Sequence, residues 1–180
     1  MDINEKALLY RAHAGDRGAA GTLYEHYYRD IYSYIFYRVN DVSTAEDLSA
    51  EVFVRMIRHL PSFLAQGKPF ISWLYTLARL VIEDYRRNPD QLISAREISG
   101  YGDNGRVVPL SRDQQALGCF QKALQHLNDN QKEIIIHRFV EGRSVEDIAD
   151  LTNQSEKAVR TLQLTALVSL EEALMKEGCL

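Results

Sequence analysis

Apolar residues recur every three or four positions through most of the chain, the spacing that collects side chains on one face of an α-helix. Three such segments fill the first half. The second segment opens at Ser43, where Glu46 completes a capping box, and is expected to end at Pro61. The third is expected to carry Pro69 in its first turn and to close at Arg87. The three apolar faces are Leu23, Tyr27, Ile31, Tyr34 and Ile35; Leu48, Val52, Met56 and Leu60; and Ile71, Leu74, Leu77, Val81 and Tyr85.

The helical pattern is interrupted once and then resumes. Residues 89–112 hold several glycines and prolines and no sustained apolar face, which is typical of a flexible linker of about 25 residues. Beyond it, Asn128 can cap a helix that is expected to run through Phe139 to Gly142. Because no segment alternates with the period of a β-strand, the sequence predicts an all-α protein. Its two small helical domains would span 1–88 and 113–180.

The second domain contains the spacing of a helix-turn-helix. Ser144, with Asp147 three residues later, can cap a short helix, and Ser155 can cap a longer one. Asn153 lies in the polar turn between them and tolerates the left-handed backbone that a tight turn requires. The spacing suits a DNA-reading motif, and it equally suits an ordinary helical hairpin. The buried face of the long helix would hold Val159, Leu162, Ala166, Leu170 and Leu174.

Charge limits how the chain could bind a nucleic acid. The 180 residues carry a net charge of −4, and the segment 113–180 accounts for all of it, with seven Lys and Arg against eleven Asp and Glu. The long helix of the helix-turn-helix offers only Lys157 and Arg160 as cations. A protein that held DNA by bulk charge would be basic, so any DNA binding here must depend on local patches or on a partner.

Composition also indicates the compartment. No apolar run approaches the length of a membrane span, and the N-terminus does not resemble a secretory signal. Cys119 and Cys179 lie far apart in the sequence, without the spacing of a zinc site. We interpret them as reduced thiols in a cytoplasmic protein rather than as a disulfide.

Two helices of the first domain carry candidate binding chemistry. Near Trp73, aromatic side chains alternate with cations, as on a platform that stacks unpaired bases; equally, Phe70 and Trp73 could be core residues. In the preceding helix Glu46, Asp47 and Glu51 lie toward the N-terminal end, either as a solvated face favoured by the helix dipole or as a docking surface for a basic partner.

No catalytic set emerges from the sequence. The five histidines are scattered, and no glycine-rich phosphate loop or metal-ligand spacing is present. We therefore expect neither an enzyme nor a cofactor.

Three motifs, taken together, resemble a bacterial RNA polymerase sigma factor of the extracytoplasmic-function (ECF) group. The resemblance covers about residues 20–87 and 115–175, in the order of the family's two conserved domains. The motifs are Ala45-Glu46-Asp47-Leu48 with Glu51-Val52-Phe53 and Arg55; Trp73-Leu74-Tyr75-Thr76-Leu77-Ala78-Arg79 with Asp84-Tyr85-Arg86-Arg87; and Val140-Glu141-Gly142 with Ser144 and Glu146-Asp147-Ile148-Ala149.

The resemblance implies a partner for each surface. Core RNA polymerase would be bound by Glu46, Asp47, Glu51, Phe53 and Arg55. The promoter −10 element would be opened and held by Lys68, Phe70, Trp73, Arg79, Arg86 and Arg87. The −35 element would be bound by Arg138, Ser155, Lys157, Arg160 and Thr161. An anti-sigma factor is the inhibitor that the family leads us to expect.

Two positions depart from the family pattern. Leu80 stands where the family commonly has an Asn shortly after the Ala-Arg pair of the promoter-melting helix, and Thr165 replaces an Arg of the recognition helix. Loss of one phosphate contact lowers the salt slope by about one unit, so we expect low affinity for the −35 element. An alternative is a sigma-like interaction protein that binds polymerase or an anti-sigma factor without reading promoters. A helix-turn-helix repressor would leave residues 45–55 unexplained.

Overall fold

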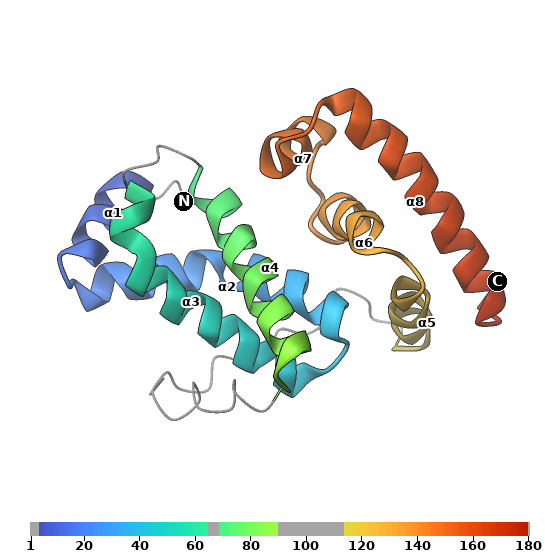
Figure 1. Ribbon diagram of the computed structural model, residues 1–180, viewed down its shortest axis with the longest axis horizontal. Helices are drawn as coiled ribbons and strands as arrows, with labels where there is room; N and C mark the ends of the chain where they lie inside the picture. Colours follow the sequence, from blue (N-terminus) through green and yellow to red (C-terminus); the bar gives the residue numbers. More distant parts are fainter. Residues whose placement is uncertain (1–3, 65–68, 90–113, 180) are drawn as a thin grey trace. The chain divides into compact units, whose positions relative to one another are not determined.

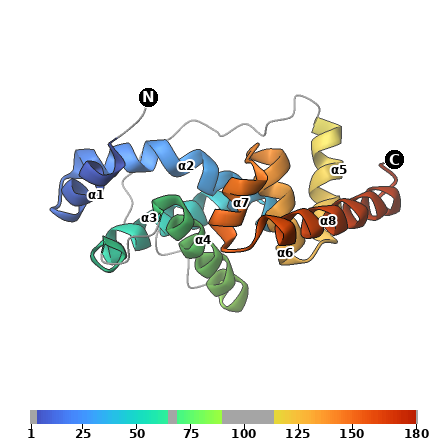
Figure 2. The same cartoon turned by 90° about the horizontal axis from the view of Figure 1, so that it is seen from above.

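The computed structural model describes residues 4–64, 69–89 and 114–179, and every regular element in these ranges is helical. The chain divides into two compact units (Figures 1 and 2). Helices α1 (Glu5–His13), α3 (Val42–Leu64) and α4 (Phe70–Arg87) belong to the first unit, together with most of α2 (Arg17–Val39). The stretch Phe36–Asn40 groups with the second unit. The predicted all-α class is confirmed.

Aromatic rings from α2 form much of the core of the first unit. The ring centroid of Tyr34 lies 4.9 Å from that of Tyr75 in α4, and that of Tyr27 lies 5.2 Å from Phe70. The expected apolar stripe of α3 is buried from Leu48 to Leu60. Tyr27 and Tyr34 of α2 therefore pack in the core. Helices α3 and α4 lie side by side (Figure 1).

Both ends of α3 differ from the prediction. At its start Asp41, not Ser43, is the capping residue: its Oδ1 accepts a hydrogen bond from the Thr44 backbone N–H at 2.7 Å. At its end Pro61 does not stop the helix, which continues to Leu64. Proline removes one hydrogen bond from a helix, but continuing the last turn brings Phe63 into the core, where it is 4% exposed.

The second unit is built around the helix-turn-helix. It comprises α5 (Gln114–Gln125), α6 (Asp129–Ile135), α7 (Val145–Thr152) and α8 (Glu156–Lys176), with α8 packed against the other three. A small core joins Ile134 of α6 to Ile148, Ala149 and Val159. Together these contacts fix the angle at which α8 leaves the turn.

The capping residues predicted for the second unit are confirmed. Asn128 forms a capping box with Gln131, and Ser144 forms one with Asp147. Asn153 has φ 53° and ψ 44°, the left-handed conformation expected for the turn, and the Ser155 side chain accepts a hydrogen bond from the Ala158 backbone N–H.

The helix after Asn128 is not regular. After Ile135 the backbone forms one π-helical turn, Ile136–Val140, and the extra residue per turn rotates the side chains that follow. Phe139, expected on the apolar face, is consequently 53% exposed.

The two cysteines form a disulfide, so the prediction of separate reduced thiols is wrong. Cys119 in α5 and Cys179 beyond the end of α8 have Cα atoms 5.9 Å apart. They are 60 residues apart in sequence, but the packing of α5 against α8 brings them together. Sequence spacing alone carried no information about that packing.

Within the part of the chain that the structure describes, no helix is both long and apolar enough to cross a membrane. Nor does any group of three or more His, Cys, Asp or Glu side chains there come together as a metal site.

The start of α3 provides a stability test with a matched control. The hydrogen bonds from Thr44 hold the pKa of Asp41 below its ordinary value, so the capping group is a carboxylate. Asp41→Ala should lower the stability of the first unit by about 1 kcal/mol, the usual contribution of an N-cap. Ser43→Ala should leave it unchanged. Thermal unfolding of both variants checks this; equal losses would contradict the assignment of the cap.

Candidate functional site

The acidic residues of α3 are not equivalent. Glu46 is exposed and Asp47 is half-buried. Glu51 is enclosed: its side chain is 13% exposed, and its Oε1 lies 2.8 Å from Nε of Arg55. Glu46 and Asp47 are therefore more accessible than Glu51, and we call them the acidic edge of α3.

Arg55 connects α3 to α4. Besides Glu51, its guanidinium lies 2.6 Å from the carboxylate of Asp84. Burial lowers the pKa of Arg55, but the hydrogen bonds and charges of Glu51 and Asp84 outweigh it and raise the pKa overall. The three side chains thus form an ion-pair bridge that ties the predicted polymerase-binding helix to the predicted promoter-melting helix.

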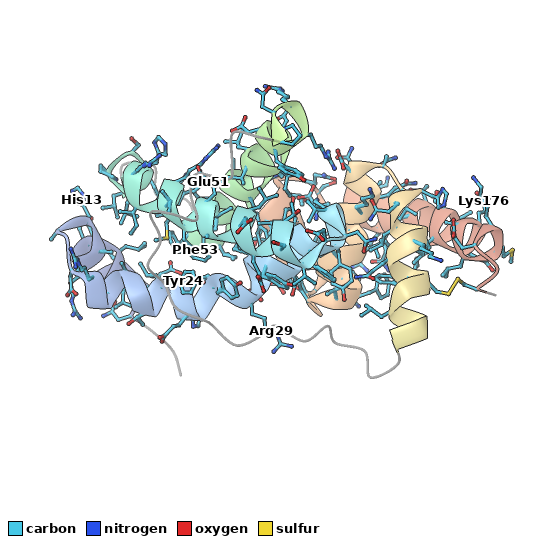
Figure 3. All side chains as sticks on the ribbon, turned by 90° about the horizontal axis from the view of Figure 1, so that it is seen from below. His13, Tyr24, Arg29, Glu51, Phe53 and Lys176 are labelled. Atoms are coloured by element: carbon cyan, nitrogen blue, oxygen red, sulfur yellow. A yellow bond between two sulfur atoms is a disulfide. The ribbon has the colours of Figure 1, made fainter. Side chains whose placement is uncertain are left out.

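Phe53 faces inward from α3, and the prediction that it contacts polymerase directly does not fit its position. The ring is 6% exposed and lies 4.7 Å, centroid to centroid, from Tyr24 of α2 (Figure 3). A buried ring cannot touch a partner without leaving the core. Phe53 instead fixes α3 on α2.

A similar correction applies to Phe70 in α4. It is 1% exposed and packs edge to face against Tyr27, so it is a core residue rather than a base-stacking one. Trp73 is half-buried, with one face stacked on Phe63 at 4.6 Å. Its remaining surface is available for contact. Lys68 lies outside the described residues.

The outer face of α4 is rich in cations. Arg79, Arg86 and Arg87 are all exposed and, with Leu80, fall on the side of the helix away from the core. Arg87 pairs with Glu83 at 2.7 Å on the same face. We call this the α4 basic face. Exposed arginines at helical spacing can neutralise successive phosphates of a nucleic-acid strand.

The start of α8 presents a weaker electrostatic surface. Lys157, Arg160 and Thr161 are exposed, but Arg160 pairs with Glu156 at 3.0 Å. The Ser155 hydroxyl is occupied as the helix cap. Farther along the same side two large apolar residues are exposed: Leu164 is 65% exposed and Val168 55%. Few cations on this side are therefore placed to bind phosphates.

Arg138 lies in the π-helical turn and stabilises the loop that precedes α7. Its Nη1 donates a hydrogen bond to the carbonyl oxygen of Arg143 at 2.8 Å. The Arg143 side chain binds Glu141, which in turn lies 2.8 Å from Nδ1 of the buried His137. These contacts set where the helix-turn-helix begins, a role that the sequence pattern did not reveal.

Comparisons with known proteins identify the family. The model for Sigma-70 region 2 matches residues 23–90, and the model for Sigma-70 region 4 matches residues 117–163. The ECF RNA polymerase sigma factor BldN of Streptomyces coelicolor is 33% identical over 175 residues, which cover 93% of this chain and 64% of BldN. SigX of Bacillus subtilis, also an ECF sigma factor, is 32% identical over 162 residues, covering 83% of this chain and 80% of SigX. The chain belongs to the ECF sigma factors of the sigma-70 family.

A solved structure shows the same fold. The sigma factor RpoE of Bartonella quintana, crystallised with the anti-sigma factor NepR, superimposes with a TM-score of 0.61 at 21% identity. The match covers 86% of this chain and 96% of RpoE.

The His137 cluster generates a pH prediction. Burial lowers the pKa of His137, but the Glu141 carboxylate 2.8 Å from its Nδ1 and the Glu133 carboxylate 3.8 Å from its Nε2 outweigh burial and raise the pKa overall. Stability from the charged imidazole is complete below the unfolded-state pKa of about 6.5 and is lost as the pH rises through the folded-state pKa. Thermal unfolding would be followed from neutral to alkaline pH. The wild-type protein should lose more stability over this range than the His137→Gln variant, which lacks the titrating imidazole. Parallel pH profiles for the two proteins would contradict it.

Proposed function

We propose that this chain is a sigma factor that binds core RNA polymerase and directs it to promoters without catalysis of its own. The observation that carries the proposal is the occurrence of both sigma-70 regions, in the family's order, on one chain. Such a protein works where the polymerase is, so we assign it to the cytoplasm.

The first unit would supply the polymerase contact and the strand-opening surface. The acidic edge of α3 would bind polymerase, with Glu46 and Asp47 as the contacting residues and the Arg55 bridge holding the helix in place. The α4 basic face and the open side of Trp73 would hold an unpaired −10 strand. Cations neutralise the backbone, and stacking adds roughly 1–3 kcal/mol per base.

The second unit would read the −35 element with low affinity. Lys157, Arg160 and Thr161 are the side chains in position, and the Glu156 carboxylate 3.0 Å from Arg160 offsets part of the charge of Arg160. Counterion release scales with the number of phosphates neutralised. The unit would therefore depend on polymerase to place it on DNA.

The alternative is a sigma-like interaction protein that has lost promoter reading. The exposed apolar residues Leu164 and Val168 on the reading side of α8 favour it, as does Leu80 on the α4 basic face. An anti-sigma factor is the expected partner in either case. RpoE, which has the same fold, is bound to such a protein in its crystal structure.

Run-off transcription separates the two proposals. Purified chain and core polymerase would be tested on a promoter library, with core polymerase alone as the control. Discrete start sites that require the chain are expected. Binding to core polymerase without any chain-dependent transcript would favour the interaction protein.

The acidic edge yields a docking prediction. Glu46→Lys should weaken core-polymerase binding at least about tenfold, because one reversed charge at a contact costs 1.4 kcal/mol or more. Its matched control is Glu25→Lys, which makes the same charge change at an exposed position of α2 and should leave affinity intact. Affinity would be measured by titration with labelled polymerase. Unchanged affinity of the Glu46 variant for core polymerase would show that the acidic edge is not the polymerase-binding surface.

Glu51→Lys serves as an internal contrast in the same experiment. It breaks the bridge to Arg55 and should lower the thermal stability of the first unit, unlike Glu46→Lys. A stable Glu51 variant would contradict the bridge.

The α4 basic face yields a strand-opening prediction. Arg86→Ala combined with Arg87→Ala should abolish permanganate reactivity of the −10 region in reconstituted holoenzyme, whereas Arg160→Ala should lower it only modestly. The control pair Arg29→Ala and Arg58→Ala removes two exposed cations elsewhere in the first unit. If Arg160→Ala lowered the permanganate reactivity as much as the double variant, α8 rather than the α4 basic face would be the main DNA contact, and the prediction would be wrong.

A further inference from the structure

Two contacts fasten the C-terminal end of α8. The disulfide joins Cys179 to Cys119 in α5, and Oε1 of Glu177 lies 2.8 Å from Nε2 of His126, just after α5. Figure 3 draws the sulfur–sulfur bond near the labelled Lys176. Val159, which belongs to the helix-turn-helix core, lies in the first turn of α8, at the opposite end of that helix. Figure 1 shows α7 next to that end of α8. The disulfide and the Glu177–His126 pair are thus at one end of α8, and the predicted DNA contacts are at the other.

The disulfide is partly exposed at the end of α8. Cys119 and Cys179 are both partly exposed. The hydrogen bond from His126, together with the charges of Lys122 and Lys176, holds the pKa of the neighbouring Glu177 below its ordinary value. Partial exposure lets a small thiol reach the sulfur atoms, whereas buried structural cysteines are inert.

We propose that Cys119 and Cys179 form a reversible redox site, opened by a small thiol reductant, that controls how firmly α5 is held to the end of α8. The inference rests on the proposed function in one respect: a sigma factor works in the cytoplasm, where thiols are kept reduced. Disulfides in such a compartment are typically transient and redox-sensing. The chemistry and its structural effect do not depend on whether the chain initiates transcription.

The exchange reaction balances with the thiol alone. A reductant thiolate attacks one cysteine sulfur, the Cys119–Cys179 bond breaks, and the other cysteine leaves as a thiolate. A second reductant thiolate attacks the resulting mixed disulfide and releases the first cysteine. Two electrons and two protons pass to the protein, and the reductant leaves as its own disulfide.

Opening the bond would loosen one end of the second unit. The cross-link closes a loop of 60 residues that contains α6, α7 and α8. Removing such a constraint raises the unfolding equilibrium constant roughly a thousandfold in the chain-entropy model. The core of Ile134, Ile148, Ala149 and Val159 contains neither cysteine. The local effect should therefore concentrate in α5 and the last turns of α8.

Glutathione titration of the full chain tests the proposal. The protein would be equilibrated in buffers of graded reduced-to-oxidised glutathione ratio and trapped by alkylation for mass spectrometry. The bonded fraction should pass reversibly from nearly all to nearly none within the series. A bond that persists in excess reduced glutathione would make the disulfide a permanent structural link. A bond that fails to form in excess oxidised glutathione would remove the site altogether.

Amide hydrogen exchange measures the structural effect in the same samples. Reduction should accelerate exchange at least about tenfold in α5 and in residues 170–177. The double variant Cys119→Ser with Cys179→Ser should behave like the reduced protein in every buffer. His126→Gln, which removes the ion pair but keeps both cysteines, should retain the glutathione response. Identical exchange in the oxidised and reduced wild-type protein would overturn the proposal.

Discussion

The bridge from Arg55 to Glu51 and Asp84 is the contact on which the proposed surfaces of the first unit depend. It joins α3 to α4 through the guanidinium of Arg55, whose side chain is 23% exposed, and the Asp84 carboxylate 2.6 Å away. With α3 fixed, Glu46 and Asp47 remain on its accessible edge. With α4 fixed, its arginines stay on the opposite side of that helix from the aromatic core. Polymerase binding and strand opening would then be two uses of one rigid helix pair.

The second unit is organised differently. Its geometry comes from local devices: two capping boxes, the Ser155 cap and the left-handed Asn153 between α7 and α8. They place the helix-turn-helix accurately but add little attraction for DNA, since the reading side of α8 continues into Leu164 and Val168. Accurate placement with weak attraction suits a module that another protein brings to its site.

Periodicity and capping rules predicted the helices because both are local properties of the chain. They also predicted the turn at Asn153 and the caps at Asn128, Ser144 and Ser155. The capping rule erred once, at the start of α3, where Asp41 caps the helix in place of Ser43. The other failures came where tertiary packing decides. Pro61 stayed inside α3, Phe53 and Phe70 turned inward against tyrosines of α2, and Cys119 met Cys179 across 60 residues. The ion pair between Arg55 and Asp84 could not be predicted either, because the pattern of one helix does not reveal which side chain of another helix it contacts.

We propose that this chain reaches promoters through polymerase rather than through its own affinity for duplex DNA. Fluorescence anisotropy of a labelled promoter fragment at physiological salt, with and without core polymerase, measures this directly. We expect no detectable binding by the chain alone and specific binding when core polymerase is present. Tight, sequence-specific binding by the chain alone would contradict the account and would instead identify a self-sufficient DNA-binding regulator.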